Sequence, residues 1–69
     1  MNKKEAEDMV SILIRCQHCL DEALLVAEKI SVAKEKEAIR KVVAFVIGEI
    51  LTEAIIPIVA QHPDLNPYN

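Results

Sequence analysis

The sequence predicts an all-α fold in which two helices pack as an antiparallel hairpin, and three observations support it. No glycine or proline occurs between Met1 and Ile47. Apolar residues in the first half recur at alternating spacings of three and four, which is the period of a helix that packs against another helix. The apolar–polar alternation of a strand is missing, and residues of high helix propensity dominate. A chain of 69 residues forms one domain, here residues 1–61 followed by a tail.

The first helix is expected over about residues 3–30. The Asn2 side chain can cap its first turn, and Glu5, three residues later, completes a capping box. The apolar residues form a stripe that we expect to face the second helix: Met9, Leu13, Cys16, Leu20, Ala23, Ala27 and Ile30, flanked by Ile12, Cys19 and Val26. The opposite side of the helix carries Lys4, Ser11, Arg15, His18, Glu22 and Lys29.

A turn is expected near residue 31, because the stretch "SVAKEKE" has no large apolar side chain except Val32. Ser31 can cap a second helix over about residues 32–60. Two arms of similar length favour an antiparallel hairpin. The alternative is one unbroken helix from residue 3 to about 60, since the stretch contains no glycine.

The end of the second helix is marked by prolines. Pro57 removes a backbone hydrogen bond to the Glu53 carbonyl, so we expect the last turn to bend or fray. The tail, residues 62–69, contains Pro63 and Pro67, and the residue before each proline favours an extended backbone. The tail is therefore expected to be irregular, either draped over the helices or mobile.

The second helix is too apolar to be covered by one partner helix. Its apolar residues spread over roughly 220° of the circumference, whereas a partner covers about 100° to 140°. Burying each remaining Ile or Val side chain contributes about 1.5–3 kcal/mol, so we expect two hairpins to form a homodimeric four-helix bundle. The predicted interface residues are Val42, Val46, Ile47, Gly48, Ile50, Leu51, Ile55 and Ile58.

Small residues line the edge of the same apolar arc. Ala44, Gly48 and Thr52 are spaced by four, so they share a helix edge. Such a track fits a close helix–helix crossing, and the alternative is that Gly48 is simply tolerated at a cost of about 1 kcal/mol in helix propensity.

Cys16 and Cys19 lie on one helix face, within the apolar stripe. The favoured interpretation is that both thiols pack in a core as small apolar side chains. The alternative is a metal site to which a symmetry-related chain supplies two more thiolates. One C-x₂-C pair is weak evidence for metal, because zinc motifs usually add a second pair or two histidines. His18 lies on the other side of the helix, and with Glu22 we expect it to form a solvated pair.

Two further glutamates border the apolar face of the second helix. Glu49 and Glu53 are four residues apart, but carboxylate metal sites in helical bundles also need Glu-x-x-His motifs, which the chain lacks. We expect them at the edge of the dimer interface, or paired with Lys41 or Arg15 across it. The sequence has no Ser-His-Asp or phosphate-loop pattern, so we expect a non-enzymatic protein without a cofactor.

The charge pattern excludes two classes of partner. The net charge is −3 and lysines alternate with glutamates, so we expect no nucleic-acid binding. Residues 42–60 approach the ~20 needed to cross a membrane. However, Glu49 and Glu53 lie at the centre, where each charge costs roughly 2.5–3.5 kcal/mol, and we expect no span. The start "MNKKEAED" does not resemble a signal peptide, which favours a cytoplasmic location and reduced cysteines.

Together these features predict a small non-enzymatic protein that acts as a homo-oligomeric interaction or structural module. The alternative function is a metal-binding bundle that uses Cys16 and Cys19 across a dimer axis. The residues predicted to contact a further protein partner are Phe45, Ile56, Leu65 and Tyr68.

Overall fold

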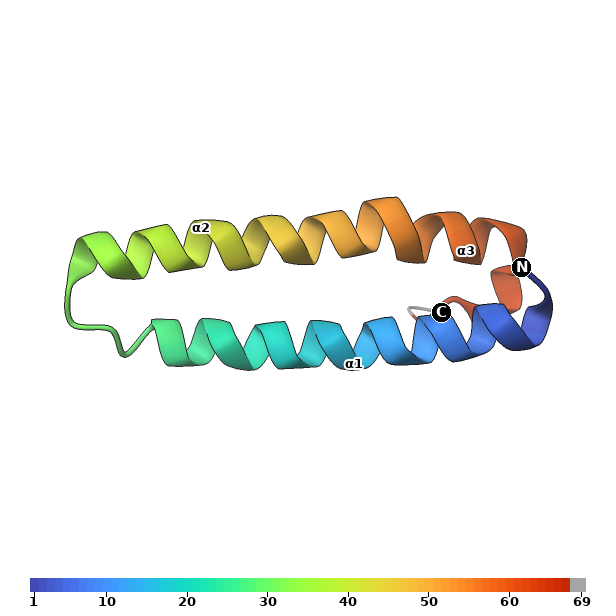
Figure 1. Ribbon diagram of the computed structural model, residues 1–69, viewed down its shortest axis with the longest axis horizontal. Helices are drawn as coiled ribbons and strands as arrows, with labels where there is room; N and C mark the ends of the chain where they lie inside the picture. Colours follow the sequence, from blue (N-terminus) through green and yellow to red (C-terminus); the bar gives the residue numbers. More distant parts are fainter. Residues whose placement is uncertain (68–69) are drawn as a thin grey trace.

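Two helical arms lie side by side and run in opposite directions in the computed structural model, which describes residues 1–67 (Figure 1). The first arm is α1, Lys3–Ala27. The second arm, Ala33–Gln61, consists of α2 (Ala33–Ile50), a π-helix (Leu51–Ile55) and α3 (Ile56–Gln61), and a short 3₁₀ turn, Pro63–Leu65, follows it. Every regular element within residues 1–67 is helical, which confirms the all-α prediction.

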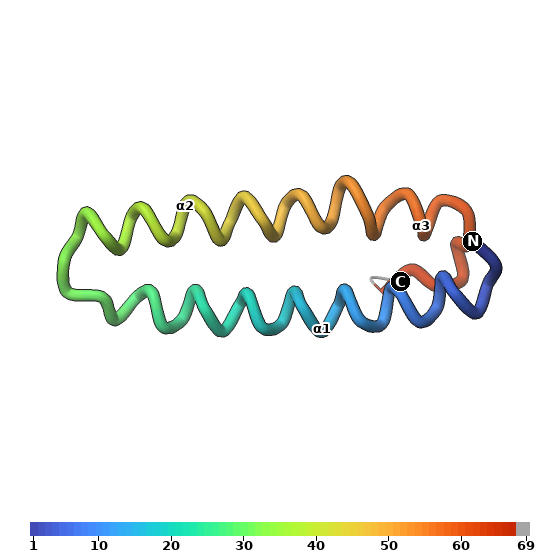
Figure 2. The backbone as a smooth tube through the Cα atoms, in the orientation of Figure 1, coloured from blue at the N-terminus to red at the C-terminus, as the bar shows by residue number. Residues whose placement is uncertain are grey.

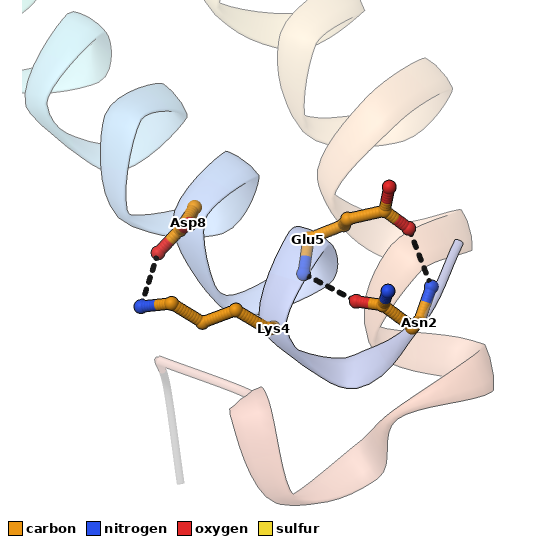
Figure 3. Close-up of polar contacts among 4 residues, drawn as sticks. All are labelled: Asn2, Lys4, Glu5 and Asp8. Atoms are coloured by element: carbon orange, nitrogen blue, oxygen red, sulfur yellow. Dashed lines mark hydrogen bonds and ion pairs between the residues drawn. The ribbon is translucent and has the colours of Figure 1, made fainter.

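The predicted capping box at the start of α1 is confirmed. Asn2 Oδ1 accepts a hydrogen bond of 2.8 Å from the Glu5 backbone N–H, and Glu5 Oε1 accepts one of 2.8 Å from the Asn2 backbone N–H (Figure 3). In the first two turns of the same helix, Lys4 Nζ lies 3.0 Å from Asp8 Oδ1. The capping box satisfies two backbone donors at the start of the helix, the N–H groups of Asn2 and Glu5, with local side chains.

The first arm ends at Ala27, three residues before the predicted end. The Lys29 backbone N–H donates to the Val26 carbonyl and the Ile30 N–H to the Ala27 carbonyl, each at 3.0 Å. Bonds to the third residue back tighten the last turn and end the α-helix.

The second arm begins at Ala33 after a reversal of the chain, which Figure 2 traces. Its N-cap residue is Val32, which makes no side-chain capping bond, so the predicted cap by Ser31 is wrong. The non-helical backbone between the arms also excludes the single unbroken helix. Arg40 Nε lies 3.3 Å from Glu28 Oε1 and joins α2 to the end of the first arm.

Pro57 lies inside the second arm without ending it. The Ile56 backbone N–H donates to the Leu51 carbonyl, five residues back, as in a π-helix. A proline ring clashes with the carbonyl four residues before it, here that of Glu53. A wider turn just before Pro57 relieves this clash, and the helix continues to Gln61 without the predicted fraying.

The core of the chain lies at the end where the tail meets both arms. Ala6, Val10 and Ile58 are buried and form one cluster. Partly buried apolar side chains pack around it: Leu13, Ile14, Val59 and Leu65. Nearer the middle and the turn, Ile55 and Ala27 are also buried.

Over the first part of α1, the face that meets the second arm is rotated from the predicted stripe. It contains Ala6, Val10 and Gln17, and Gln17 Nε2 donates a hydrogen bond of 3.2 Å to the Ile47 carbonyl oxygen. Of the predicted stripe, Ala27 is buried, Leu13, Leu20, Ala23 and Ile30 are partly buried, and Met9 and Cys16 are exposed. Met9 is 43% exposed because it lies on the flank of this face.

The tail is draped over the end of the arms, one of the two alternatives for it. Lys3 Nζ lies 2.6 Å from Asp64 Oδ2, and His62 Nε2 lies 3.4 Å from the Met1 carbonyl oxygen. Leu65 packs against the core cluster, so its contacts are with its own chain. Tyr68 and residue 69 lie outside the described residues.

Candidate functional site

An open apolar groove of about 710 Å³ runs between the two arms at their mid-length. Its lining is almost entirely apolar, with a single charged side chain, that of Arg15. The groove is lined by Ile12, Arg15, Cys16, Cys19 and Leu20 from α1 and by Val46 and Ile50 from α2.

Further exposed apolar side chains extend the groove toward both ends. Met9 precedes Cys16 by seven residues and Val26 follows Cys19 by seven, so all four lie along one side of α1. On α2, Ile39 and Val42 precede Val46 by seven and four residues. The exposed fractions of these added side chains are 43% for Met9, 63% for Val26, 46% for Ile39 and 62% for Val42. We call these residues and the groove lining together the groove face.

Cys16 and Cys19 are exposed in the groove, so the described chain by itself does not bury them in a core. The rotation of α1 places Ala6, Val10 and Gln17 at the contact between the arms and moves the thiols to its flank. Within residues 1–67, no three Cys, His, Asp or Glu side chains are grouped to hold a metal ion. A metal at these thiols would therefore need ligands from a second chain.

Unpaired charges border the groove face. Arg15 was assigned to the polar side of α1 by the sequence pattern, but it lines the groove. It is adjacent in sequence to Cys16 and so lies about 100° from it around the helix. The adjacency of Arg15 to Cys16 in the sequence is the signal that indicates this placement. Glu49 follows Val46 by three residues, which places it on the neighbouring outer edge of α2. Arg15 and Glu49 are exposed, and neither forms an ion pair within residues 1–67.

The predicted interface residues divide into three groups. Val42, Val46 and Ile50 belong to the groove face. Ile55 and Ile58 are 1% and 9% exposed, so the chain itself buries them, and we remove them from the predicted interface. The remaining members are only partly buried: Ile47, Gly48 and Leu51.

Gly48 makes no close helix crossing inside the chain. A Cβ atom built at this position would meet nothing within 4 Å. The Gly48 carbonyl oxygen accepts a hydrogen bond of 2.9 Å from Thr52 Oγ1, four residues on. Within residues 1–67, Gly48 therefore does not mark a close approach of two helices.

Two further cavities lie elsewhere on the chain, one bordered by charged side chains and one mainly apolar. One, of about 330 Å³, is mostly charged and is lined by Leu24, Glu28, Glu37, Arg40, Lys41 and Ala44. The other, of about 370 Å³, lies where the tail meets the second arm and is lined by Leu51, Ile55, Ile56, Val59, Ala60, Asn66 and Pro67.

Two of the four residues predicted to contact a further partner, Phe45 and Ile56, have exposed side chains. Phe45 and Ile56 are 67% and 52% exposed.

His18 and Glu22 are also exposed, and no ion pair joins them.

The second arm is long and apolar enough to cross a membrane, judged by length and composition alone. Ala33–Gln61 spans 29 residues, and its most apolar window has a mean hydropathy of 2.2. Only 6% of that window is buried. A single such helix is weak evidence for a membrane span, because the core helix of a soluble protein and a signal sequence near the N-terminus pass the same test.

Comparison of the chain with protein-family models, with curated proteins and with solved structures gives no match in any of the three.

Proposed function

We propose that the protein is a non-enzymatic interaction module that works as a homo-oligomer, in which a second copy covers the groove face. One observation carries this proposal. The described chain buries five apolar side chains, two of them alanines, and leaves ten large apolar side chains exposed. A core of that size contributes little stability, and small scaffolds rely on disulfides, metals or partner chains.

A second copy is the partner that the exposed residues fit best. The groove face runs along both arms, so two such faces can stack and bury both sets of apolar side chains in a four-helix bundle. Burial of each large apolar side chain contributes about 1.5–3 kcal/mol, and several are exposed on each chain. Cys16 and Cys19 would then pack inside the bundle as small apolar groups.

The outer surface of such a bundle would contact a further protein. Phe45 and Ile56 remain exposed on the second arm and would supply its apolar contacts. We place this assembly in the cytoplasm, where free thiols stay reduced.

A second candidate function is supported by the exposed thiols. Two Cys16–Cys19 pairs, one from each chain, would supply the four thiolates of a tetrahedral zinc site. Metal analysis of the purified protein separates the two candidates, since the interaction module needs no bound metal.

Two matched substitutions test the proposal. Ile12 lines the groove and is 47% exposed. Leu25 is 68% exposed and follows Cys16 by nine residues, which places it about half a turn away on the helix. We expect Ile12→Gln to weaken dimerisation at least tenfold, because it buries an amide in the interface. Leu25→Gln should leave dimerisation unchanged.

Sedimentation velocity at several concentrations measures the effect, and circular dichroism shows whether each variant stays helical. Equal dimer affinities for the two variants and the wild type would contradict the proposed surface. A wild type that is monomeric and floats with phosphatidylcholine vesicles would replace the second copy with a membrane.

A further inference from the structure

We propose that the second copy docks about a two-fold axis parallel to the helices, so that Arg15 of each chain pairs with Glu49 of the other. This inference rests on the proposed function and adds the orientation of the partner. It also assigns two residues that determine specificity, Arg15 and Glu49, neither of which has an ion-pair partner within residues 1–67.

The relative heights of the two residues along the bundle follow from the contact between Gln17 and Ile47. Gln17 Nε2 lies 3.2 Å from the Ile47 carbonyl oxygen, so residues 17 and 47 are side by side. The arms are antiparallel and each rises about 1.5 Å per residue. Moving two residues back on α1 and two forward on α2 therefore pairs the height of Arg15 with that of Glu49.

A two-fold axis parallel to the helices leaves every residue at its own height. Arg15 of one chain is then level with Glu49 of the second copy as well as with its own Glu49. The rotation also places α1 of each chain over the second arm of the other, and every neighbouring pair of helices is antiparallel, as in an up-down bundle.

Arg15 of one chain and Glu49 of the other also come to the same lateral edge of the interface. Arg15 lines the groove at its α1 margin, and Glu49 lies on the outer edge of α2 beside Val46. When α1 stacks on the second arm of the partner, these two margins come together. The apolar centre stacks at the same time, with Cys16 and Cys19 against the partner's Val46 and the partner's Ile50. Charges at the margin of an apolar seam determine which partner and which orientation are preferred.

The rival arrangement is a two-fold axis perpendicular to the helices. Arg15 is the midpoint of Lys3–Ala27, and Ile47 is the midpoint of Ala33–Gln61. Full coverage of the groove face would place this axis near both midpoints. Arg15 of one chain would then approach Arg15 of the other, and like charges placed together are unfavourable.

Charge reversal tests the pairing. Arg15→Glu and Glu49→Arg should each weaken the homodimer by roughly tenfold, because each creates two like-charge contacts. An equimolar mixture of the two variants restores opposite charges at both contacts of the heterodimer. We therefore expect native mass spectrometry to show the heterodimer well above the statistical half of all dimers. The double variant Arg15→Glu/Glu49→Arg should dimerise within about threefold of the wild type.

Matched controls carry the same changes of charge elsewhere. Lys29→Glu changes an exposed residue in the turn, and Glu37→Lys changes one in the charged cavity. Neither should favour a heterodimer. Arg15→Gln distinguishes the two axes, because it weakens the dimer if Arg15 meets Glu49 and strengthens it if Arg15 meets Arg15.

The outcomes separate this inference from the proposed function. Suppose that the wild type dimerises but the mixture of Arg15→Glu and Glu49→Arg shows no excess of heterodimer, or that Arg15→Gln dimerises more tightly than the wild type. Either result overturns the Arg15–Glu49 pairing and leaves the interaction module standing. A wild type that stays monomeric at every concentration overturns both.

Discussion

Gln17 and Ile47 are joined across the two arms by a hydrogen bond of 3.2 Å, which Gln17 Nε2 donates to the Ile47 carbonyl oxygen. The same carbonyl already accepts the Leu51 backbone N–H within the second arm. The other amide atom, Gln17 Oε1, is buried and accepts no hydrogen bond. This contact places residues 17 and 47 side by side and leaves one buried polar atom unpaired.

Gln17→Leu should raise the free energy of unfolding by about 1 kcal/mol, because it removes an unpaired buried acceptor while the Ile47 carbonyl keeps its helical partner. Urea unfolding at matched protein concentration measures the change. Gln17→Ala is the control, since it removes the amide without replacing its volume. A Gln17→Leu variant less stable than the wild type would show that the interhelical hydrogen bond contributes more than the unpaired atom costs.

Ile58 and Ile56 form a matched pair on one helix. Ile58 is 9% exposed in the core cluster, and Ile56 is 52% exposed. We expect Ile58→Ala to lower the free energy of unfolding by about 2–5 kcal/mol and Ile56→Ala by about 0.5 kcal/mol or less. Thermal or urea unfolding compares the two, and equal losses would contradict the assignment of the core.

The capping box gives a local prediction. Asn2→Ala removes the acceptor of the Glu5 backbone N–H and should lower the free energy of unfolding by about 1 kcal/mol. Asn2→Asp keeps an acceptor at the same position and should retain most of that stability. Hydrogen exchange of the first-turn amides in α1 localises the effect, and equal exchange in Asn2→Ala and the wild type would refute the cap.

The contact between the tail and α1 should be sensitive to acid. The hydrogen bond from the Lys3 ammonium lowers the pKa of Asp64 below its ordinary 3.8. A group whose pKa falls on folding stabilises the folded state above its unfolded pKa. That contribution is lost as the pH falls through the lower folded value. The tail should therefore remain attached at neutral pH and loosen in strong acid.

An NMR titration of the Asp64 carboxyl measures this pKa directly. In Lys3→Met it should return toward 3.8. Lys4→Met is the control, because Lys4 pairs with Asp8 and not with Asp64. An Asp64 pKa that is the same in wild type and Lys3→Met would exclude the contact in solution.

The parts of the fold that the sequence predicts are those governed by local chemistry. The cap at Asn2 depends on residues three apart, and the helical period depends on neighbours within one turn. The rotation of α1 was missed because the pattern counted apolar residues only and placed Gln17 outside the contact, although its amide faces Ile47. The π-helix before Pro57 was missed because a backbone can relieve a proline clash without ending a helix.

The groove face illustrates the limit of the pattern for the candidate site. Its apolar members were visible in the sequence, but which of them the second arm would cover depended on the rotation of α1. A shift of the contact toward Ala6 and Val10 exposes Cys16 and Cys19 and brings Arg15 to the groove. The converse holds for Ile55 and Ile58, which the pattern predicts at a dimer interface but the chain itself buries, Ile58 against α1 and the tail.

The central claim is that the groove face is covered by a second copy of the chain, and sedimentation equilibrium of the wild type tests it most directly. We expect a mass of twice the 7.7 kDa chain over a wide range of concentrations, with dissociation and loss of helicity coupled on dilution. A mass of one chain, with full helicity retained at the lowest and highest concentrations, would contradict the account.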